Sequence, residues 1–206
     1  LPNVIFEIWN EPSTDSSRAY YEWSQIKTYA EKVIPAIRKY SNNLVIVGTP
    51  RWSGDLSDAS ADPLDPTKYP NVAYTFHFYA CTHPITDLKA GQISAIPVFI
   101  TEWGSTPSDG GSKGTTCLDA AEKAVNAGKA SVEEWYSLKI DPNKISSMNW
   151  SLVNKAEASA ALAGTSGPEG FWDLETGLSR SGKWVRNMIR EHCAKDSTTC
   201  PWLGDT

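Results

Sequence analysis

Short apolar runs alternate with longer amphipathic stretches along the chain. Five runs are almost continuous in apolar side chains, at residues 3–9, 43–49, 71–80, 97–103 and 145–153. Short runs without a polar face are typical of parallel strands that are covered on both sides. The pattern therefore predicts five parallel strands.

The stretches between these runs repeat apolar residues at helical spacing. They predict amphipathic helices over 17–40, 118–138 and 182–193. The segment 51–70, rich in Asp, Ser and Pro, is expected to carry at most a short helix, and 104–117 is expected to be a loop.

Several tryptophans and other apolar residues occupy the core positions of these helices. Trp23, Trp135 and Trp184 lie at core spacing, and we assign them to packing. Ala121 and Ala124 are expected on the buried face of the second helix.

A β-α-β-α alternation means a parallel sheet, either open or closed into a barrel. The chain has 206 residues and begins on a strand, whereas a (β/α)8 barrel usually needs about 250 residues. The expected structure is a small open sheet, or the later part of a barrel whose first strands lie elsewhere. We see no internal repeat and no second domain, so residues 1–206 are expected to form one domain, with 194–206 as a tail.

Composition narrows the class of protein. A net charge of −5 without a Lys/Arg cluster argues against nucleic acid as a partner. No apolar run approaches the roughly 20 residues that cross a bilayer. The nine tryptophans and eight tyrosines are expected either to pack in the core or to bind the flat apolar faces of sugars.

Four cysteines, an even number, suit an oxidising compartment, and we expect a secreted or cell-surface protein. Cys193 and Cys200 flank a short polar loop, which suggests a disulfide bond near the C-terminus. We guess the pairs Cys193–Cys200 and Cys81–Cys117, while three pairings are possible and free thiols stay an alternative.

Polar and aromatic residues stand at the carboxyl end of the predicted strands, where parallel α/β folds place their sites. Asn10 and Glu11 follow the first strand, His77 and Tyr79 end the third, Glu102 ends the fourth, and Trp150 lies in the fifth. His77 and Tyr79 are two apart and share one face, opposite Phe76 and Phe78. The strand ends therefore predict one shared site.

Glu7 lies in the same predicted strand as Glu11, four residues earlier and roughly 13 Å lower at about 3.3 Å per residue. We expect it to be a hydrogen-bonded group inside the sheet that does not reach the site. Pro12 is expected to end the strand just after Glu11 and to fix the turn that aims it.

Two glutamates on separate strand ends meet the needs of glycosidic bond cleavage, which uses one proton donor and one attacking carboxylate. Two close carboxyls repel when both are ionised, so one is expected to hold a proton while the other stays charged. Glu11 and Glu102 are the candidate pair, with ordinary surface or capping carboxylates as the alternative.

Four segments resemble those of glycoside hydrolase family 5, in its bacterial endoglucanase branch. They are "VIFEIWNEPS" (4–13), "TFHFYA" (75–80), "VFITEWGSTPSDGG" (98–111) and "MNWSLVNKAEASAAL" (148–162). The resemblance implies a retaining endo-β-1,4-glucanase acting on β-glucan or cello-oligosaccharides. It implies that Glu11 is the general acid and then the base, and that Glu102 is the nucleophile.

The same resemblance implies roles for the neighbouring residues. Asn10 would bond the sugar 2-hydroxyl, Tyr79 would donate to Glu102, and His77 would bond substrate hydroxyls or position Glu11. Trp150 would lie under the reacting sugar. The remaining members of the implied substrate-binding set are Trp52, an aromatic platform, and Lys155 and Glu157, which contact further sugars.

Plainer interpretations stay open for several of these residues. His77 and Trp150 could belong to the core, Trp52 could be an ordinary half-exposed aromatic, and Lys155 with Glu157 could form a surface ion pair. The family mechanism implies no metal and no organic cofactor. No metal-ligand spacing of histidines, no Gly-x-Ser-x-Gly elbow and no phosphate loop occurs in the sequence.

The resemblance covers strands four to eight of a (β/α)8 barrel together with their helices. Strands one to three are expected from a missing or separate N-terminal chain, and activity is expected of the completed barrel rather than of this chain alone. Alternatives are a β-mannanase or xyloglucanase on the same scaffold, or an inactive carbohydrate-binding fragment.

Overall fold

The computed structural model of this chain describes residues 1–13, 21–107, 115–125, 129–163 and 176–195. The chain divides into two compact units. The first comprises Leu1–Phe78, His83–Trp103 and Glu134–Met148, and the second comprises Tyr79–Thr82, Gly104–Glu133 and Asn149–Thr206. Among the described residues, no helix combines the length and the apolar character needed to cross a membrane.

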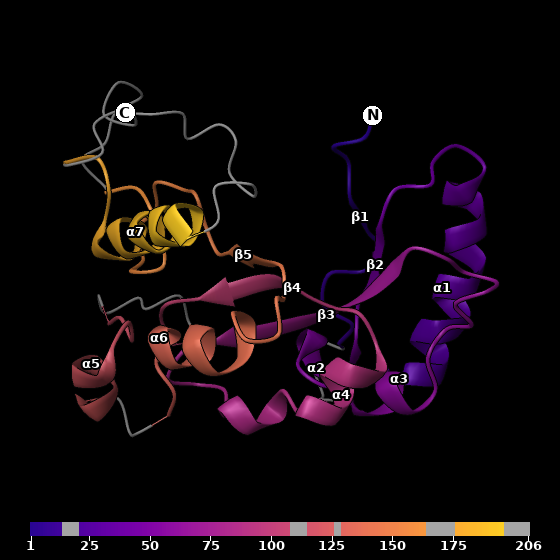
Figure 1. The fold of residues 1–206 in the computed structure, drawn as a ribbon, viewed down its shortest axis with the longest axis horizontal. Coiled ribbons are helices and arrows are strands. Elements are labelled where there is room, and N and C mark those ends of the chain that lie inside the picture. Colours follow the sequence, from indigo (N-terminus) through magenta and orange to yellow (C-terminus); the bar gives the residue numbers. More distant parts are fainter. Residues whose placement is uncertain (14–20, 108–114, 126–128, 164–175, 196–206) are drawn as a thin grey trace. The chain divides into compact units, whose positions relative to one another are not determined.

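The five strands form one sheet, in which strands that are neighbours in the sequence are also neighbours in space (Figure 1). They are β1 (Phe6–Glu7), β2 (Val45–Val47), β3 (Val72–Tyr79), β4 (Val98–Gly104) and β5 (Ser147–Asn149). β1 pairs with β2, and β2 with β3, in parallel. All five predicted strands are confirmed, and the unbroken order is that of a segment of a β/α barrel.

Helices separate the strands. They are α1 (Trp23–Arg38), α2 (Pro50–Ser53), α3 (Ser57–Ala61), α4 (Ala90–Ala95), α5 (Ala120–Val125), α6 (Val132–Trp135) and α7 (Arg180–Lys195). A 3-10 turn spans Ile85–Asp87, and a π turn spans Tyr136–Ile140. α1 and α7 confirm two predicted helices; residues 17–20 of the first prediction lie outside the described residues.

The helix predicted over 118–138 is wrong as one element. Residues 129–131 are not helical and separate α5 from α6. The Ala130 carbonyl accepts a hydrogen bond from the Cys81 backbone, and the Val132 N–H donates to the Cys117 carbonyl. These backbone groups are used by neighbouring segments, so they cannot complete a helix. Ala121 and Ala124 are exposed, against our expectation.

The segment 51–70 holds more helix than predicted. The last residues of α2 and the whole of α3 lie in it, and α4 follows at 90–95 without having been predicted. Short polar helices of this kind lack the apolar repeat on which periodicity depends.

The first unit has its core on the helix-covered side of β3. Phe78 stacks on Trp135 with ring centroids 4.0 Å apart, and Phe76 lies 6.0 Å from the same ring. Trp23 of α1 meets Tyr74, and its indole N–H donates to the Asp62 carbonyl. Trp23 and Trp135 are buried as predicted. The even-numbered residues of β3 therefore hold the sheet to its helices.

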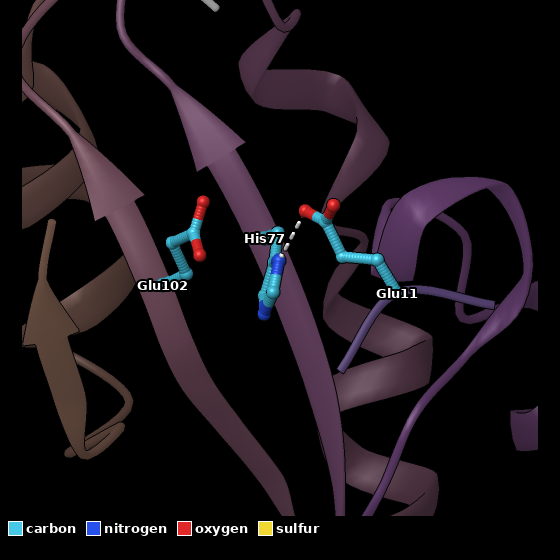
Figure 2. A group of neighbouring side chains, drawn as sticks. All are labelled: Glu11, His77 and Glu102. Atoms are coloured by element: carbon cyan, nitrogen blue, oxygen red, sulfur yellow. Dashed lines mark hydrogen bonds and ion pairs between the residues drawn. The ribbon is translucent and has the colours of Figure 1, made fainter. Parts of the chain in front are cut away.

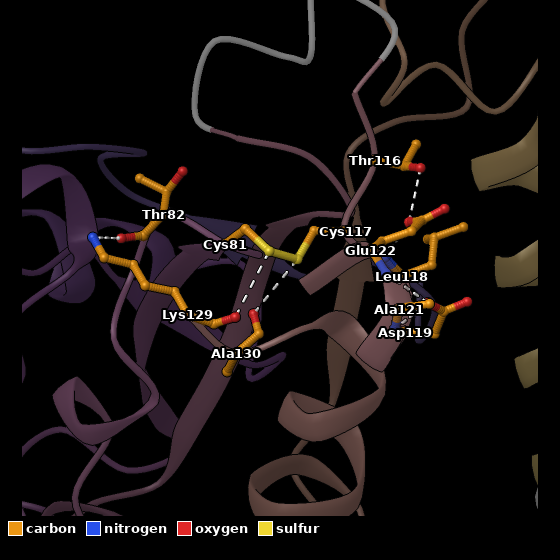
Figure 3. Close-up of a disulfide and its surroundings, with 10 residues drawn as sticks. All are labelled: Cys81, Thr82, Thr116, Cys117, Leu118, Asp119, Ala121, Glu122, Lys129 and Ala130. Atoms are coloured by element: carbon orange, nitrogen blue, oxygen red, sulfur yellow. Dashed lines mark hydrogen bonds between the residues drawn. A yellow bond between two sulfur atoms is a disulfide. The ribbon is translucent and has the colours of Figure 1, made fainter. Parts of the chain in front are cut away.

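The second unit is cross-linked by a disulfide between Cys81 and Cys117, with Cα atoms 5.9 Å apart (Figure 3). This pair confirms one of the two guessed bridges. Lys129 donates to the Thr82 carbonyl, so the segments after β3, after β4 and before α6 meet here. The pair Cys193–Cys200 cannot be traced, because Cys200 and the tail 196–206 lie outside the described residues.

Candidate active site

The segment that carries Asn10 and Glu11 leaves the sheet earlier than predicted. β1 ends at Glu7, and the last backbone bond to β2 is from the Ile8 N–H to the Ile46 carbonyl. Trp9 then takes a positive φ of 142°. The turn therefore begins at Trp9, and our prediction that Pro12 ends the strand is wrong.

The Asn10 backbone is fixed by a hydrogen bond. The hydroxyl of buried Ser53 donates to the Asn10 carbonyl over 2.8 Å. The side chain of Asn10 stays exposed, which leaves it able to meet a ligand.

His77 of β3 lies between the two glutamates (Figure 2). Its Nδ1 is 2.8 Å from Glu11 Oε1, and its Nε2 is 2.9 Å from the Thr101 hydroxyl. The imidazole is 3% exposed, whereas the Glu11 side chain is 30% exposed. Both ring nitrogens are engaged, so the ring orientation is set by the protein and Glu11 can still face solvent.

Glu102 of β4 completes the group. One carboxylate oxygen of Glu11, one of Glu102 and a ring nitrogen of His77 all lie within 4.8 Å of one another. Distance alone would let these three groups share a cation. Two of them are already joined by the hydrogen bond between Glu11 and His77. The predicted residues Glu11, His77 and Glu102 are therefore brought together.

Glu7 comes closer to this group than predicted. It accepts a 2.8 Å hydrogen bond from Thr101, which in turn contacts His77. As a residue Glu7 is exposed rather than enclosed in the sheet. Its carboxyl group is nevertheless partly desolvated, and this burial raises the pKa of Glu7. The bond from Thr101 confirms the expectation that Glu7 is hydrogen-bonded, while its exposure contradicts the expectation that it lies inside the sheet.

In the second unit, Tyr79 lies against the backbone of Gly104. A Cβ at Gly104 would come within 2.3 Å of the Tyr79 ring. Glycine is required here because any side chain would displace the phenol. The last residues of β3 and β4 are thereby packed together, a contact that no sequence pattern predicted.

Trp52 lies in α2, in a turn with an unusual backbone. Arg51, Trp52 and Ser53 all have positive φ, between 54° and 58°. Left-handed conformations cost about 1–2 kcal/mol for residues with a side chain, and such strain is found at functional sites. The Trp52 side chain is 41% exposed. A strained turn thus presents an indole to solvent.

The last predicted site residues belong to the second unit. Trp150 follows β5 and is 44% exposed, so the alternative of a core indole is wrong. Lys155 and Glu157 form an ion pair of 2.9 Å, and Glu157 also accepts a bond from Ser159. The hydrogen bond from Lys155 lowers the pKa of Glu157. The ion pair is present, and a role in sugar contact stays a prediction.

The sheet order and the paired carboxylates at its strand ends define a β/α-barrel segment with a glycosidase-like site. The chain belongs to glycosyl hydrolase family 5: the Cellulase family model matches residues 1–156. It is 42% identical over 197 residues to endoglucanase A of Evansella cellulosilytica. It is 37% identical over 203 residues to an endoglucanase of Clostridium saccharobutylicum.

These matches cover 92% and 97% of this chain but only 36% and 40% of the two relatives. Among solved structures, the catalytic domain of Thermobifida fusca endoglucanase Cel5A superposes with a TM-score of 0.68 at 28% identity. The match covers 91% of this chain and 57% of that one. The fold is therefore part of a family 5 (β/α)8 barrel.

Sequence reasoning missed Thr101 and misjudged Glu7. Both stand inside the family segments quoted above; Thr101 was given no role, and Glu7 was expected only to be a hydrogen-bonded group inside the sheet. Alternation along β4 offered no usable signal for Thr101, because it places Thr101 and Glu102 on opposite faces of the strand. Which groups they meet depends on the pairing of distant strands.

Proposed function

We propose that this chain carries the catalytic pair of a retaining endo-β-1,4-glucanase. The supporting observation is the spacing of the two carboxylates: one oxygen of Glu11 and one oxygen of Glu102 lie within 4.8 Å of each other. Retaining glycosidases hold their carboxyl groups about 5–5.5 Å apart, while inverting enzymes need about 6.5–9.5 Å to admit a water. The spacing favours direct attack on the sugar.

In the first step the Glu102 carboxylate attacks the anomeric carbon as the bond to the leaving oxygen breaks. Glu11 transfers its proton to that oxygen, and a glycosyl-enzyme forms. In the second step Glu11 takes a proton from water, whose oxygen displaces Glu102. Each step uses only these two side chains and water, and no metal or organic cofactor is required.

Further residues have supporting roles in this proposal. Asn10 bonds the sugar 2-hydroxyl, a contact that strengthens in the transition state. Trp52 and Trp150 offer aromatic faces to sugar rings. Tyr79, Lys155 and Glu157 keep the substrate-binding roles that the family resemblance implies.

β-1,4-Glucan is the proposed substrate. A variant of the Thermobifida fusca enzyme was solved in complex with cellotetraose, at 26% identity to this chain. The curated relatives are endoglucanases. The Cys81–Cys117 bridge favours an oxidising compartment, which fits secretion toward an insoluble polymer.

The test is hydrolysis of soluble cellulose derivatives. Because the chain spans less than half of its curated relatives, we would assay it alone and with a polypeptide that supplies the preceding barrel strands. Glu102→Gln should lower kcat by about 10³-fold or more, and Glu11→Gln by about 10²–10⁴-fold.

The matched control is Glu133→Gln, which changes an exposed glutamate and should leave turnover intact. Proton NMR of the first-formed product should show retained anomeric configuration. Unchanged turnover in Glu102→Gln, or an inverted product, would rule out this mechanism. Comparing glucan, mannan and xyloglucan would assign the polymer.

A further inference from the structure

Hydrogen bonds link Glu7, Thr101, His77 and Glu11 in series. Thr101 donates to Glu7 over 2.8 Å and lies 2.9 Å from His77 Nε2. His77 Nδ1 lies 2.8 Å from Glu11. Two members of this series, Glu7 and Thr101, have no part in the mechanism described above.

The series has a direction because each hydroxyl has one proton. Thr101 donates its proton to the Glu7 carboxylate, which can only accept. Toward His77, Thr101 must then accept, so the imidazole proton lies on Nε2. A neutral imidazole of this tautomer presents a lone pair at Nδ1. With that neutral ring, Glu11 bonds the Nδ1 lone pair as a protonated carboxyl, whereas a doubly protonated ring would instead donate to an ionised Glu11.

We propose that Glu7 and Thr101 are positioning residues that hold His77 in its Nε2–H tautomer and thereby keep the catalytic proton on Glu11. This inference rests on the proposed function only in treating the proton on Glu11 as the one used in catalysis. The hydrogen-bond order from Glu7 to Glu11 can be tested without any substrate.

The network also suits the second step. Once Glu11 has given its proton to the leaving oxygen, an ionised carboxylate faces the bare Nδ1 lone pair. Two acceptors in contact repel, so the arrangement favours recapture of a proton. The attacking water supplies that proton as its oxygen bonds to the sugar. The same four residues therefore support both the acid and the base role of Glu11.

Several charged groups act on Glu7, which begins the series. Burial raises the pKa of Glu7, and the hydrogen bond from Thr101 opposes that rise. An ionised Glu102 adds to the rise, as Glu11 does once it has given up its proton, whereas a protonated His77 would lower the pKa of Glu7. When Glu7 becomes protonated in acid, it can donate to Thr101 and the order can reverse. The proposed direction of donors and acceptors from Glu7 to Glu11 therefore holds at pH values at which Glu7 is ionised.

The first experiment reads the tautomer directly by ¹⁵N NMR of labelled histidine in the full 206-residue chain near neutral pH. The chain has three histidines, and a His83→Gln, His192→Gln background leaves only His77. We expect one protonated nitrogen, Nε2, and one bare nitrogen, Nδ1. Thr101→Val, which removes the hydroxyl at nearly constant size, should shift His77 toward the Nδ1–H tautomer.

Two further variants control this measurement. Thr101→Ser keeps the hydroxyl and should restore the Nε2–H signal. Thr28→Val removes an exposed hydroxyl on α1 and should change nothing. An Nδ1–H tautomer or a doubly protonated ring in the unmodified chain would overturn the proposal, as would an unchanged spectrum in Thr101→Val.

The second experiment uses the completed barrel and soluble cellulose. Thr101→Val should lower kcat about ten-fold, a fraction of the 10²–10⁴-fold that general acid catalysis supplies, with little change in KM. The alkaline limb of the pH profile of kcat/KM should move to lower pH, since Nδ1–H would favour ionised Glu11. Glu7→Gln should move it in the same direction by a smaller shift.

The two experiments separate the two claims. If the barrel hydrolyses no glucan but the NMR order is as expected, the proposed function fails and the hydrogen-bond order stands. If hydrolysis occurs and the alkaline limb stays in place in Thr101→Val, the positioning role fails and the proposed function stands. A loss of kcat that Thr101→Ser does not recover indicates a purely structural effect and also overturns the positioning role.

Discussion

On one face of β3, Phe76 and Phe78 are buried against the ring of Trp135. On the other face, His77 is equally buried but bonds to Glu11 and Thr101. Neighbouring residues of one strand thus meet an apolar layer and a polar network, because side chains alternate across a sheet. Burial on the first face stabilises the fold, and burial on the second orients the chemistry.

The largest effect should come from the apolar face. Phe78→Ala removes a fully buried ring and leaves a cavity, so the free energy of unfolding should fall by about 3–5 kcal/mol. Urea denaturation followed by tryptophan fluorescence measures it. Phe78→Leu keeps more of the volume and should cost clearly less; equal losses would mean that the cavity contributes little and that the loss comes from the missing ring stack.

The disulfide beyond the end of β3 should have the next largest effect. A Cys81→Ser, Cys117→Ser double variant opens a loop of 36-residue separation, for which chain entropy gives about 3–4 kcal/mol. Thermal unfolding with and without reductant should show this difference in the unmodified chain, while the double variant should respond less, through its remaining cysteines alone. Equal sensitivity of both proteins to reductant would contradict the assignment.

The polar face should show the opposite pattern to Phe78. His77→Gln should lower kcat about 10²-fold on soluble cellulose, which is about 2.7 kcal/mol, because Glu11 loses its oriented partner. The unfolding free energy should change by less than in Phe78→Ala. If His77→Gln instead unfolded the protein at unchanged kcat per folded molecule, the two faces would not differ as described.

The smallest effect is expected at Tyr136, in the aromatic layer. Its hydroxyl bonds Ser147 at 2.7 Å, and burial raises the pKa of Tyr136 to about 12. The unfolded phenol ionises first, near its usual value, so stability is full below that pH and is lost as pH rises toward about 12.

Tyr136→Phe should remove this alkaline dependence and cost about 1 kcal/mol near neutral pH through the lost hydrogen bond. Chemical denaturation at neutral and alkaline pH measures both quantities. Identical alkaline slopes in the two proteins would show that another group titrates.

The sequence was most informative where a pattern repeats locally. The hydrophobic repeat, with the Gly, Pro and polar residues that interrupt it, located all five strands and both long helices. Burial on a sheet or helix face imposes a fixed spacing of apolar residues. These signals failed over 118–138, where the backbone of Ala130 bonds to Cys81. A contact with a residue so far away leaves no local signal.

The candidate site divides in the same way. Glu11, His77 and Glu102 were predicted together because parallel strands present their carboxyl ends at one edge. Thr101 and Glu7 were not, although they stand within the same motifs.

By itself, then, the sequence determined the alternation of strands and helices, the family, and the strand ends at which acid and imidazole groups stand. Only the tertiary structure decided that Trp9 turns the chain out of β1, and that Thr101 joins Glu7 to His77. The physical reason is that hydrogen bonds between strands depend on register and on distances of a few tenths of an ångström. Those quantities are fixed by packing across the whole sheet rather than by neighbours in the chain.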